Sequence, residues 1–561
     1  MKEAVVEVLK KALKEKDYKL SNEEIYSLIE TPKNISKGDF AFPCFSLSKI
    51  SKLPPHEIAL EVRAKIPKKH LLDFEEILVD GPYINFYLDE KEVARKAVWN
   101  AISKKNKYGM SKIGAGKKII VEYSSPNIAK PLGIGQLRST IIGNSVANMA
   151  DFLGYKVHRL NYLGDWGTQF GKVLFGYEKF GSDAKLMKDP LKHLMDVYVK
   201  VNKKSLEPKA KEYFNKLENG DKPSLMLWKI FRDASIKELK KLYSKLGMEF
   251  DEWSGESKSI NKTEKVFENL LKKKIIKKSK GAYIANLKEY GLDILVIKKD
   301  DGGSTYALRD LATAIDRKKK KDFFKMIYET GQEQSLYFKQ VFKLLELLGL
   351  DWAKDCFHVD HGFYLDKDGK RFSTRKGKLV FAKDILEEIQ DKAKKEISKR
   401  FKLSKIELER RSNAVAVAAL FYGDLKTFRR NDVVFDAQTF VSFEGNTGPY
   451  LLYSYARASS IIEKSKQPGK FEILNLKDSE LFLSKKINEF PEIVSKAFNS
   501  SSPSLIANYC YDLSKLFNTF YHSCQVIDSE NESFRLALVE AFRITLRNSL
   551  NLLGINVIDK M

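Results

Sequence analysis

The pattern of apolar and polar positions divides the chain into four pieces. In the first, residues 1 to about 90, apolar side chains recur at helical spacing over residues 5–13. The stretch EEILVDGPYINFYL has two apolar runs around the turn-forming pair Gly81 and Pro82, and it predicts two paired strands. We therefore expect a small α/β module, followed by a charged helical linker over residues 91–112.

The second piece begins with KKIIVEYSSPN, a β-branched run that ends in turn residues and is typical of a buried parallel strand. A turn containing Gly133 and Gly135 follows, then a helical pattern over residues 137–153 and a second strand pattern, YKVHRLNYL. Strand, glycine turn, helix and strand in this order predict a βαβ unit.

The third piece interrupts this alternation and then resumes it. Residues 181–290 are Lys-rich and predict a helical insertion. Alternation resumes at LDILVIKKDDGGSTYALRDLATAI, continues through FFKMIYETG and CFHVDHGFYL, and stops near residue 385. Within it, the basic run RKKKK at residues 317–321 is more typical of a solvated helix end than of a binding site. The fourth piece, from about residue 390 to 561, predicts an α-helical bundle.

Composition narrows the function classes. The 561 residues include 99 Lys+Arg and 74 Asp+Glu, and the net charge of +25 favours a polyanionic partner, with nucleic acid first, although a lysine-rich surface without a partner fits equally well. No apolar run approaches the roughly 18 residues of a membrane-spanning helix. The charged N-terminus predicts an amphipathic helix and not a signal peptide. The four cysteines form no CxxC pair, which argues against a disulfide scaffold or zinc knuckle and predicts a cytoplasmic protein.

The first strand–helix turn, residues 121–140, reads VEYSSPNIAKPLGIGQLRST. Ligands of open α/β sheets bind at the carboxyl ends of strands, and a helix N-terminus presents free N–H groups to an anion. Gly133 and Gly135 would let a ligand approach the backbone, so the turn is a candidate phosphate or nucleotide site. It matches neither GxGxxG nor a P-loop, and a tight turn without a ligand explains it as well.

Two later segments add candidate chemistry. GDWGTQFG, residues 164–171, places Asp165 and Gln169 among glycines after the second strand. KRFSTRKGKLV, residues 370–380, is a basic, hydroxyl-rich loop whose cations would gather around a polyphosphate, unless it is a solvated surface turn.

Taken together, these segments resemble class I aminoacyl-tRNA synthetases, and among them the arginyl-tRNA synthetases. The resemblance runs in order through VEYSSPNIAKPLGIGQLRSTIIGN, NYLGDWGTQFGK, STYALRDLATAI, GQEQSLYFKQ, RFSTRKGK and FEGNTGPYLLYSYARA. KGDFAFPCFSL and DGPYINFYL also resemble the N-terminal module of that family, so the matches span residues 37 to about 460. The remaining bundle resembles the family's anticodon-binding domain only in its helical character.

The resemblance implies a multidomain α/β protein. Residues 1–112 would form a tRNA-elbow-binding module and linker, and residues 113–385 a Rossmann-like parallel-sheet catalytic domain with its helical insertion at about 181–290. Residues 386–561 would form an all-α anticodon-binding domain.

The same resemblance implies a reaction and partners. Arginine would be activated by ATP with Mg²⁺ and transferred to the 2′-hydroxyl of the terminal adenosine of tRNA-Arg, through positioning and charge stabilisation without a protein nucleophile. tRNA would generally have to bind before arginine is activated. We expect no structural zinc, no membrane contact and a monomer.

An arginine guanidinium needs planar, anionic, bidentate acceptors. Glu122 and Asp310 are the carboxylates at the family's arginine-binding positions, and Asn127, Tyr306 and Gln334 are the matching polar residues. Tyr306 and Asp310 lie four apart in a helical pattern, so both can face one pocket. Core packing of Tyr306 and a helix salt bridge of Asp310 are the alternatives.

The resemblance also assigns the remaining sites. The catalytic set is Lys130, Gln136, Arg371, Ser373, Thr374, Arg375 and Lys376. The ATP-binding set is Gly133, Ile134, Gly135, Gln136, Gly164, Asp165, Trp166, Gly167, Gln169 and His358. The tRNA-binding set, whose rings would stack on anticodon bases unless they pack in the bundle core, is Tyr450, Tyr453, Tyr455 and Arg457.

The chain departs from the family at its signature, HIGH, which here reads GIGQ over residues 133–136. Gln136 can donate an N–H but is neutral, and loss of one transition-state donor costs ~10²–10³ in rate. Lys130 and the 370–376 loop would compensate in part, and His361 could approach that loop. His361 and His358 lie three apart, on opposite faces of a strand, which argues against a metal pair. Two hypotheses stay open: an active synthetase slowed at activation, or a non-catalytic tRNA-binding paralogue or variant.

Overall fold

The structure, a computed structural model, describes residues 2–561 apart from 33, 35, 36, 67–73, 301, 373, 376, 377 and 466–469. Its contacts divide the chain into two compact units. Unit 1 consists of Met1–Lys105, Ile461–Glu489 and Leu516–Ile544, and unit 2 of Asn106–Ser460, Phe490–Lys515 and Thr545–Met561.

Unit 1 contains the predicted N-terminal α/β module. Its antiparallel sheet has the order β1-β3-β2, with β1 (Phe40–Pro43), β2 (Phe74–Asp80) and β3 (Tyr83–Leu88). The helices are α1 (Lys2–Lys14), α2 (Asn22–Leu28), α3 (Phe45–Ser51), α4 (Pro55–Ala64) and α5 (Glu90–Lys104). The apolar face of α1, including Leu9, packs with Phe42 and Phe86 in one core. The strand pair around Gly81 and Pro82 is confirmed.

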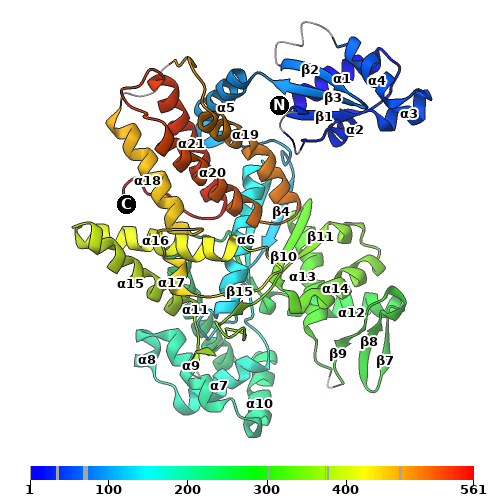
Figure 1. Cartoon of the computed structure of the whole chain (residues 1–561). Coiled ribbons are helices and arrows are strands. Elements are labelled where there is room, and N and C mark those ends of the chain that lie inside the picture. Colours follow the sequence, from blue (N-terminus) through cyan, green and yellow to red (C-terminus); the bar gives the residue numbers. More distant parts are fainter. Residues whose placement is uncertain are drawn as a thin grey trace. The chain divides into compact units, whose positions relative to one another are not determined.

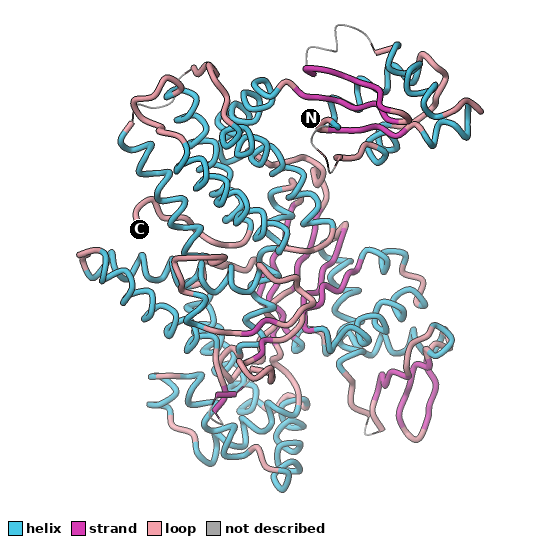
Figure 2. Tube along the Cα trace, in the orientation of Figure 1, coloured by secondary structure: helices cyan, strands magenta, loops and turns pink. Residues whose placement is uncertain are grey.

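Unit 2 contains a five-stranded parallel sheet of order β11-β10-β4-β5-β6, which carries the candidate active site (Figure 2). The strands are β4 (Lys118–Glu122), β5 (Lys156–Leu163), β6 (Glu252–Gly255), β10 (Lys325–Gly331) and β11 (Cys356–His361). Helix α6 (Ile134–Phe152) connects β4 to β5, which confirms the βαβ unit. It packs so closely on the sheet that a Cβ at Gly143 would lie 2.2 Å from the Cβ of Tyr123.

The predicted helical content of residues 181–290 is confirmed for the first part only. After α7 (Thr168–Phe180), residues up to Lys245 form α8 (Asp183–Lys188), α9 (Pro190–Val201), α10 (Glu207–Glu218) and α11 (Lys222–Lys245). The chain then returns to the central sheet as β6, inside the range assigned to the insertion.

The strand pattern LDILVIKK also belongs elsewhere than predicted. It forms β9 (Ile294–Lys298), which pairs with β7 (Ile276–Ser279) and β8 (Ala282–Asn286) in a separate antiparallel sheet next to α12 (Thr263–Lys272) (Figure 1). Ile294 and Val296 are exposed on it, whereas a central parallel strand is buried on both faces.

The rest of the chain is mostly helical, as predicted. Unit 2 continues with α13 (Tyr306–Lys321), α14 (Ser335–Leu347), α15 (Ala382–Arg400), α16 (Lys405–Leu425) and α17 (Ala437–Phe440). The later helices are α18 (Gly448–Lys464), α19 (Asp478–Asn499), α20 (Ser504–Ser523) and α21 (Glu532–Leu552). Short strand pairs join β12 (Tyr364–Leu365) to β15 (Val433–Val434) and β13 (Thr374–Arg375) to β14 (Lys378–Leu379). None of the helices described combines the length and apolarity needed to cross a membrane.

The close approach of α6 to β4 makes a stability prediction. Gly143→Ala should lower the free energy of unfolding by about 1–3 kcal/mol, because the added methyl overlaps Tyr123. Gly135→Ala is the matched control: it lies on the same helix, its Cβ would meet nothing within 4 Å, and it should be neutral or up to about 1 kcal/mol stabilising. Urea unfolding followed by circular dichroism measures both; equal midpoints would contradict the packing argument.

Candidate active site

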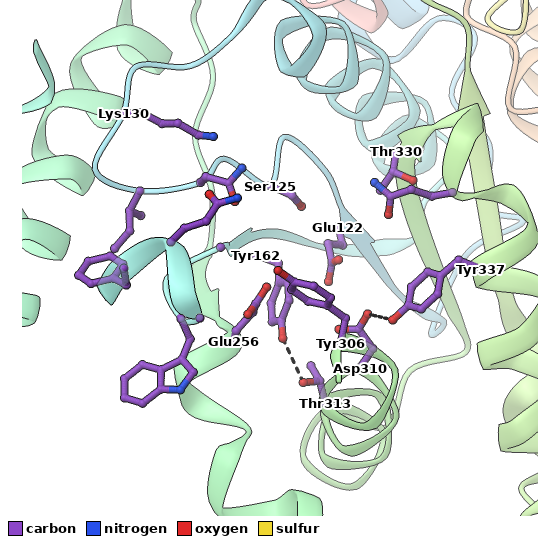
Figure 3. Close-up of a pocket in the computed structure, with 18 of the residues that line it drawn as sticks. Glu122, Ser125, Lys130, Tyr162, Glu256, Tyr306, Asp310, Thr313, Thr330 and Tyr337 are labelled. Atoms are coloured by element: carbon purple, nitrogen blue, oxygen red, sulfur yellow. Dashed lines mark hydrogen bonds between the residues drawn. The ribbon is translucent and has the colours of Figure 1, made fainter. Parts of the chain in front are cut away.

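A cavity of about 570 Å³ opens at the carboxyl edge of the parallel sheet (Figure 3). Glu122 is the last residue of β4, and Gly164 and Glu256 directly follow β5 and β6. Tyr306 and Asp310 enter from α13, and Figure 3 shows both directed into the cavity, beside Glu122 and Glu256. The predicted common face of Tyr306 and Asp310 is thus confirmed.

Glu122 already has a cationic partner inside the protein. Its carboxylate forms an ion pair with the guanidinium of Arg317, which lies 4.9 Å from the ring centre of Tyr162. Burial raises the pKa of Glu122, and Arg317 opposes that rise. The prediction that residues 317–321 form a solvated helix end is therefore wrong for Arg317, which is 7 % exposed.

Asp310 is half-buried, and its carboxylate accepts a hydrogen bond from the hydroxyl of Tyr337. Removal from water raises its pKa, because the charged form loses hydration that one hydroxyl does not replace. Tyr306 covers the pocket from the solvent side, with 58 % of its surface exposed. Among the described residues, no cation lies as close to Asp310 as Arg317 lies to Glu122. A cation that enters the pocket can therefore pair with Asp310.

Sequence reasoning missed a third carboxylate, Glu256. Burial raises its pKa to about 8, and its nearest cation, Arg309, keeps Nη2 3.4 Å from Oε2. The signal was available: Glu256 directly follows a strand of the central sheet, where ligand-binding residues gather. It was hidden because residues 252–255 had been assigned to the insertion.

A second cavity, of about 460 Å³, adjoins the first and shares part of its wall. The shared lining residues are Ser125, Asn127, Thr330, Glu333 and Gln334. The second cavity adds Gly135 and Gln136 from the first turn of α6, together with Arg138, His361 and Arg371. Two of the predicted arginine-binding residues, Asn127 and Gln334, therefore stand at the boundary between the two cavities.

Gln136 closes the signature turn on itself. Its Oε1 accepts a hydrogen bond from the backbone N–H of Gly133 at 3.1 Å, and its Nε2 donates to the carbonyl of Ser125 at 3.4 Å. This is the reciprocal half of a helix capping box. Gly133 and Ile134, both predicted to bind ATP, are not among the residues that line either cavity.

The predicted cations are divided between the two cavities. Lys130 lines the first, where burial lowers its pKa, and Arg371 lines the second, with its guanidinium 3.7 Å from the ring centre of Phe363. Ser373 and Lys376 lie outside the described residues, as do the side chains of Thr374 and Arg375.

The GDWG segment also divides. Gly164, Trp166, Gly167 and Gln169 line the first cavity. Asp165 is absent from the lining of both and is fully buried: it pairs with Nε of Arg232 at 3.0 Å and accepts hydrogen bonds from the N–H and hydroxyl of Ser257. The geometry thus gives Asp165 a role in holding this loop against α11 and the segment after β6.

The two histidines of β11 differ in position. His358 hydrogen-bonds to the hydroxyl of Thr330 at 2.8 Å, stacks on Phe338 and lines neither cavity. His361 lines the second cavity. The expectation that His358 contacts ATP therefore has no support from the geometry, whereas the approach of His361 has.

The predicted tRNA-binding side chains lie on α18. Tyr455 is 2 % exposed and packs in the core, so its prediction as a base-stacking residue is wrong. Tyr453 is exposed, and Arg457 lies 4.9 Å from its ring centre. Tyr450 is half-buried beside Tyr511.

Comparisons with known proteins cover nearly the whole chain. Family models match residues 1–88 (arginyl tRNA synthetase N terminal domain), 97–437 (tRNA synthetases class I (R), catalytic domain) and 451–561 (DALR anticodon binding domain). The arginine–tRNA ligase of Clostridium acetobutylicum is 41% identical over 552 residues, which cover 96% of this chain and 97% of the relative. That of Clostridium perfringens is 40% identical, with 97% of each chain covered.

Solved structures show the same fold. The Thermus thermophilus arginyl-tRNA synthetase superposes with a TM-score of 0.83 at 24% identity, and all of both chains is covered. The arginyl-tRNA synthetase of Plasmodium falciparum gives 0.79 at 25% identity, with 99% of this chain and 98% of that one covered.

The ion pair between Asp165 and Arg232 allows a test of whether Asp165 supports the fold or contacts ATP. Asp165→Asn should destabilise the protein by about 3 kcal/mol, because the variant leaves Arg232 without its charged partner. Asp233→Asn is the matched control: Asp233 is an exposed carboxylate 3.8 Å from the same guanidinium, and its loss should cost under about 1 kcal/mol. Thermal unfolding and ATP titration measure the two roles; weakened ATP binding with unchanged stability would contradict this assignment.

Proposed function

The chain belongs to the class I arginyl-tRNA synthetases, and from this premise we propose that the two adjoining cavities are its arginine and ATP sites. The matched domains and relatives indicate an arginine–tRNA ligase with arginine, ATP and tRNA as partners. They give no support to the alternative of a non-catalytic paralogue. The residues in each role, stated below, are our proposal.

One observation carries the assignment of the arginine site: it has one more acidic side chain than internal guanidinium groups. Three acidic side chains, those of buried Glu122 and Glu256 and half-buried Asp310, face two buried guanidinium groups, those of Arg309 and Arg317. If all three acids were ionised, one negative charge would lack a partner, and the empty pocket avoids that cost because Glu256 is protonated below about pH 8. A substrate guanidinium supplies the missing positive charge, and its planar set of donors matches carboxylate acceptors.

The second cavity suits ATP. The first turn of α6 aims backbone N–H groups at an anion, Gly135 leaves open space for it, and Arg371 adds a positive charge. Mg²⁺ would arrive with the triphosphate, whose oxygens it prefers as ligands. Among the described residues, no group of three His, Cys, Asp or Glu side chains is placed to hold a metal ion.

The reaction then takes place at the shared wall. Asn127 and Gln334 would hold the amino-acid end of arginine so that its carboxylate oxygen attacks the α-phosphorus of ATP in line. A C–O–P bond forms, the bond to pyrophosphate breaks, and the cations of the second cavity stabilise the leaving group. The 2′-hydroxyl of the terminal tRNA adenosine subsequently attacks the arginyl carbonyl and releases AMP.

We extend the proposal to the rest of the chain. The N-terminal module would contact the tRNA elbow, and Tyr450, Tyr453 and Arg457 would contact the anticodon stem or loop, where rings and Arg can stack on bases. We also propose domain boundaries at residues 112 and 385, a cytoplasmic location and a monomeric state. Four buried free thiols are compatible with a reducing compartment.

A charging assay with labelled arginine, ATP and tRNA-Arg tests the function directly. The chain should charge tRNA, and Asp310→Asn should raise the KM for arginine about 10- to 100-fold, because a charge-assisted hydrogen bond is lost, with the KM for ATP little changed. Asp322→Asn, an exposed carboxylate at the end of the same helix, should leave both values unchanged. No charging by the unaltered chain would refute the function, and an unchanged arginine KM in Asp310→Asn would refute the site.

The raised pKa of Glu256 predicts a pH dependence of arginine binding. Below about pH 8 Glu256 is protonated in the empty pocket, so a bound guanidinium must displace a proton. The affinity for arginine should therefore rise from pH 6 to 8, by up to about tenfold per unit, and level off above. Glu256→Gln should bind more weakly and lose this slope. Calorimetry in buffers of different ionisation enthalpy measures the released proton; an identical slope in Glu256→Gln would assign the titration to another group.

A further inference from the structure

The first cavity already holds a guanidinium that belongs to the protein. Arg317 lines this cavity from α13, is 7 % exposed, and forms an ion pair with Glu122. The proposed mechanism uses Glu122 as an acceptor for the substrate but gives Arg317 no part. A buried cation in the wall of a cation-binding cavity repels the substrate, so its presence there is favourable only if it serves the acid beside it.

The register of three neighbouring strands builds an enclosure for the Arg317 guanidinium. Tyr328 on β10 lies opposite Glu122 on β4, and Leu160 on β5 lies opposite Glu122 from the other side. Tyr162 lies two residues after Leu160 and therefore on the same face of the sheet. The guanidinium carbon of Arg317 lies 4.9 Å from the ring centre of Tyr162 and 5.9 Å from that of Tyr328. One carboxylate and two aromatic rings therefore surround it, and both kinds of group attract a guanidinium.

Helix spacing brings Arg317 to this enclosure. Tyr306, Asp310, Thr313 and Arg317 recur at intervals of four, three and four residues, and all four line the cavity. At about 1.5 Å per residue, Arg317 is attached about 10 Å further along α13 than Asp310. One helix face therefore carries an acid for the substrate and, two turns later, a cation for the acid on the neighbouring strand.

Electrostatics indicate what Arg317 does for Glu122. Burial raises the pKa of Glu122, Arg317 lowers it, and the charge of Asp310 raises it again. Three other titratable groups face the pair from β5, β10 and β11, namely Tyr162, Tyr328 and Cys356. Burial raises the pKa of each of these three, so they stay uncharged at neutral pH. Of all these groups, Arg317 is the one that favours the charged form of Glu122.

We propose that Arg317 is a positioning residue for arginine recognition: it fixes the charge and the direction of the Glu122 carboxylate, with which the substrate guanidinium pairs. The ion pair joins Nη1 of Arg317 to Oε2 of Glu122, which leaves Oε1 as the oxygen for the substrate. Arg317 acts through Glu122 and does not itself bind arginine. The inference rests on the proposed function, because it requires the first cavity to be the arginine site.

Arg317→Met tests the inference, because it keeps a long apolar side chain and removes the charge. We expect the KM for arginine in tRNA charging to rise about 10- to 100-fold at about pH 7.5, with kcat and the KM for ATP changed less than about threefold. An unchanged arginine KM would overturn the inference even if the variant is less stable, because loss of a purely structural ion pair lowers stability without a selective effect on arginine.

The pH dependence of arginine binding should change in the same variant. Without the opposing cation, Glu122 holds its proton to a higher pH. The affinity of Arg317→Met for arginine should therefore keep rising at pH values where that of the unaltered chain has levelled off. Calorimetric titrations with arginine between about pH 7 and 9 measure this difference, and identical pH profiles would contradict the proposed role.

Two further variants separate charge from shape and from a general effect on the helix. Arg317→Lys keeps the positive charge but not the planar donors, so it should restore the pH profile and recover part of the arginine KM. Lys320→Met removes an equal charge from exposed Lys320 of the same helix, which pairs with Asp316, and should leave both quantities unchanged. A pH profile of Arg317→Lys equal to that of Arg317→Met would assign the effect to packing and overturn the role of charge.

A double-mutant cycle shows whether Arg317 acts through Glu122. Adding Arg317→Met to Glu122→Gln should change the arginine KM by less than about twofold, because the carboxylate that Arg317 positions is already gone. The double variant removes both charges of the pair, so it also serves if Arg317→Met alone does not fold. A further rise of about tenfold would show that Arg317 acts on arginine by another route and would overturn the inference.

The unaltered chain distinguishes a failure of the proposed function from a failure of this inference. If it does not charge tRNA with arginine, the proposed function itself is refuted. If it charges tRNA and Asp310→Asn raises the arginine KM, whereas Arg317→Met keeps the arginine KM and pH profile of the unaltered chain, this inference alone is refuted.

Discussion

The site depends on a set of side chains at one edge of a parallel sheet in which acids outnumber internal cations. Two of the three carboxylates, Glu122 and Glu256, have internal cationic partners, and Asp310 has a tyrosine hydroxyl. The guanidinium of Arg317 stabilises the charge of Glu122 when no substrate is bound. Other carboxylate oxygens of the pocket remain able to accept hydrogen bonds from a substrate. Because Glu256 is protonated in the empty pocket, a cation that binds there can replace that proton, and the paired oxygens of carboxylates suit a guanidinium better than an ammonium.

The parallel sheet brings these charges together because its strands all end at the same edge. Glu122 ends β4, Gly164 follows β5, Glu256 follows β6, and His361 ends β11. Residues separated by more than 200 positions thus line two adjoining cavities without any long loop to carry them. The close packing of Gly143 on Tyr123 and the burial of Asp165 against Arg232 serve the same end, since both fix segments that continue from strand ends.

Sequence reasoning predicted the parts of this arrangement that depend on local pattern. The βαβ unit, the position of Tyr306 and Asp310 on one helix face, and the placement of Arg371 in the same cavity as the glycine-rich turn follow from periodicity and residue type. It failed where a long-range contact decides: Arg317 looks like one member of a basic run until Glu122 is placed beside it, and Tyr455 looks like its exposed neighbour Tyr453 until the bundle buries it. Glu256 was missed because β6 is a short strand in the middle of a helical segment, and only its pairing with β5 reveals it.

The same distinction bears on the signature turn. In the sequence, replacement of both histidines reads as a loss of phosphate donors. In the structure, the side-chain oxygen of Gln136 accepts a hydrogen bond from the backbone N–H of Gly133. Gln136 therefore stabilises the turn, although it replaces a histidine of the signature. The amide of Gln136 is neutral. Positive charge at the phosphates of ATP must therefore come from other residues of the cavity wall. Arg371, which lines the second cavity, supplies a permanent positive charge there.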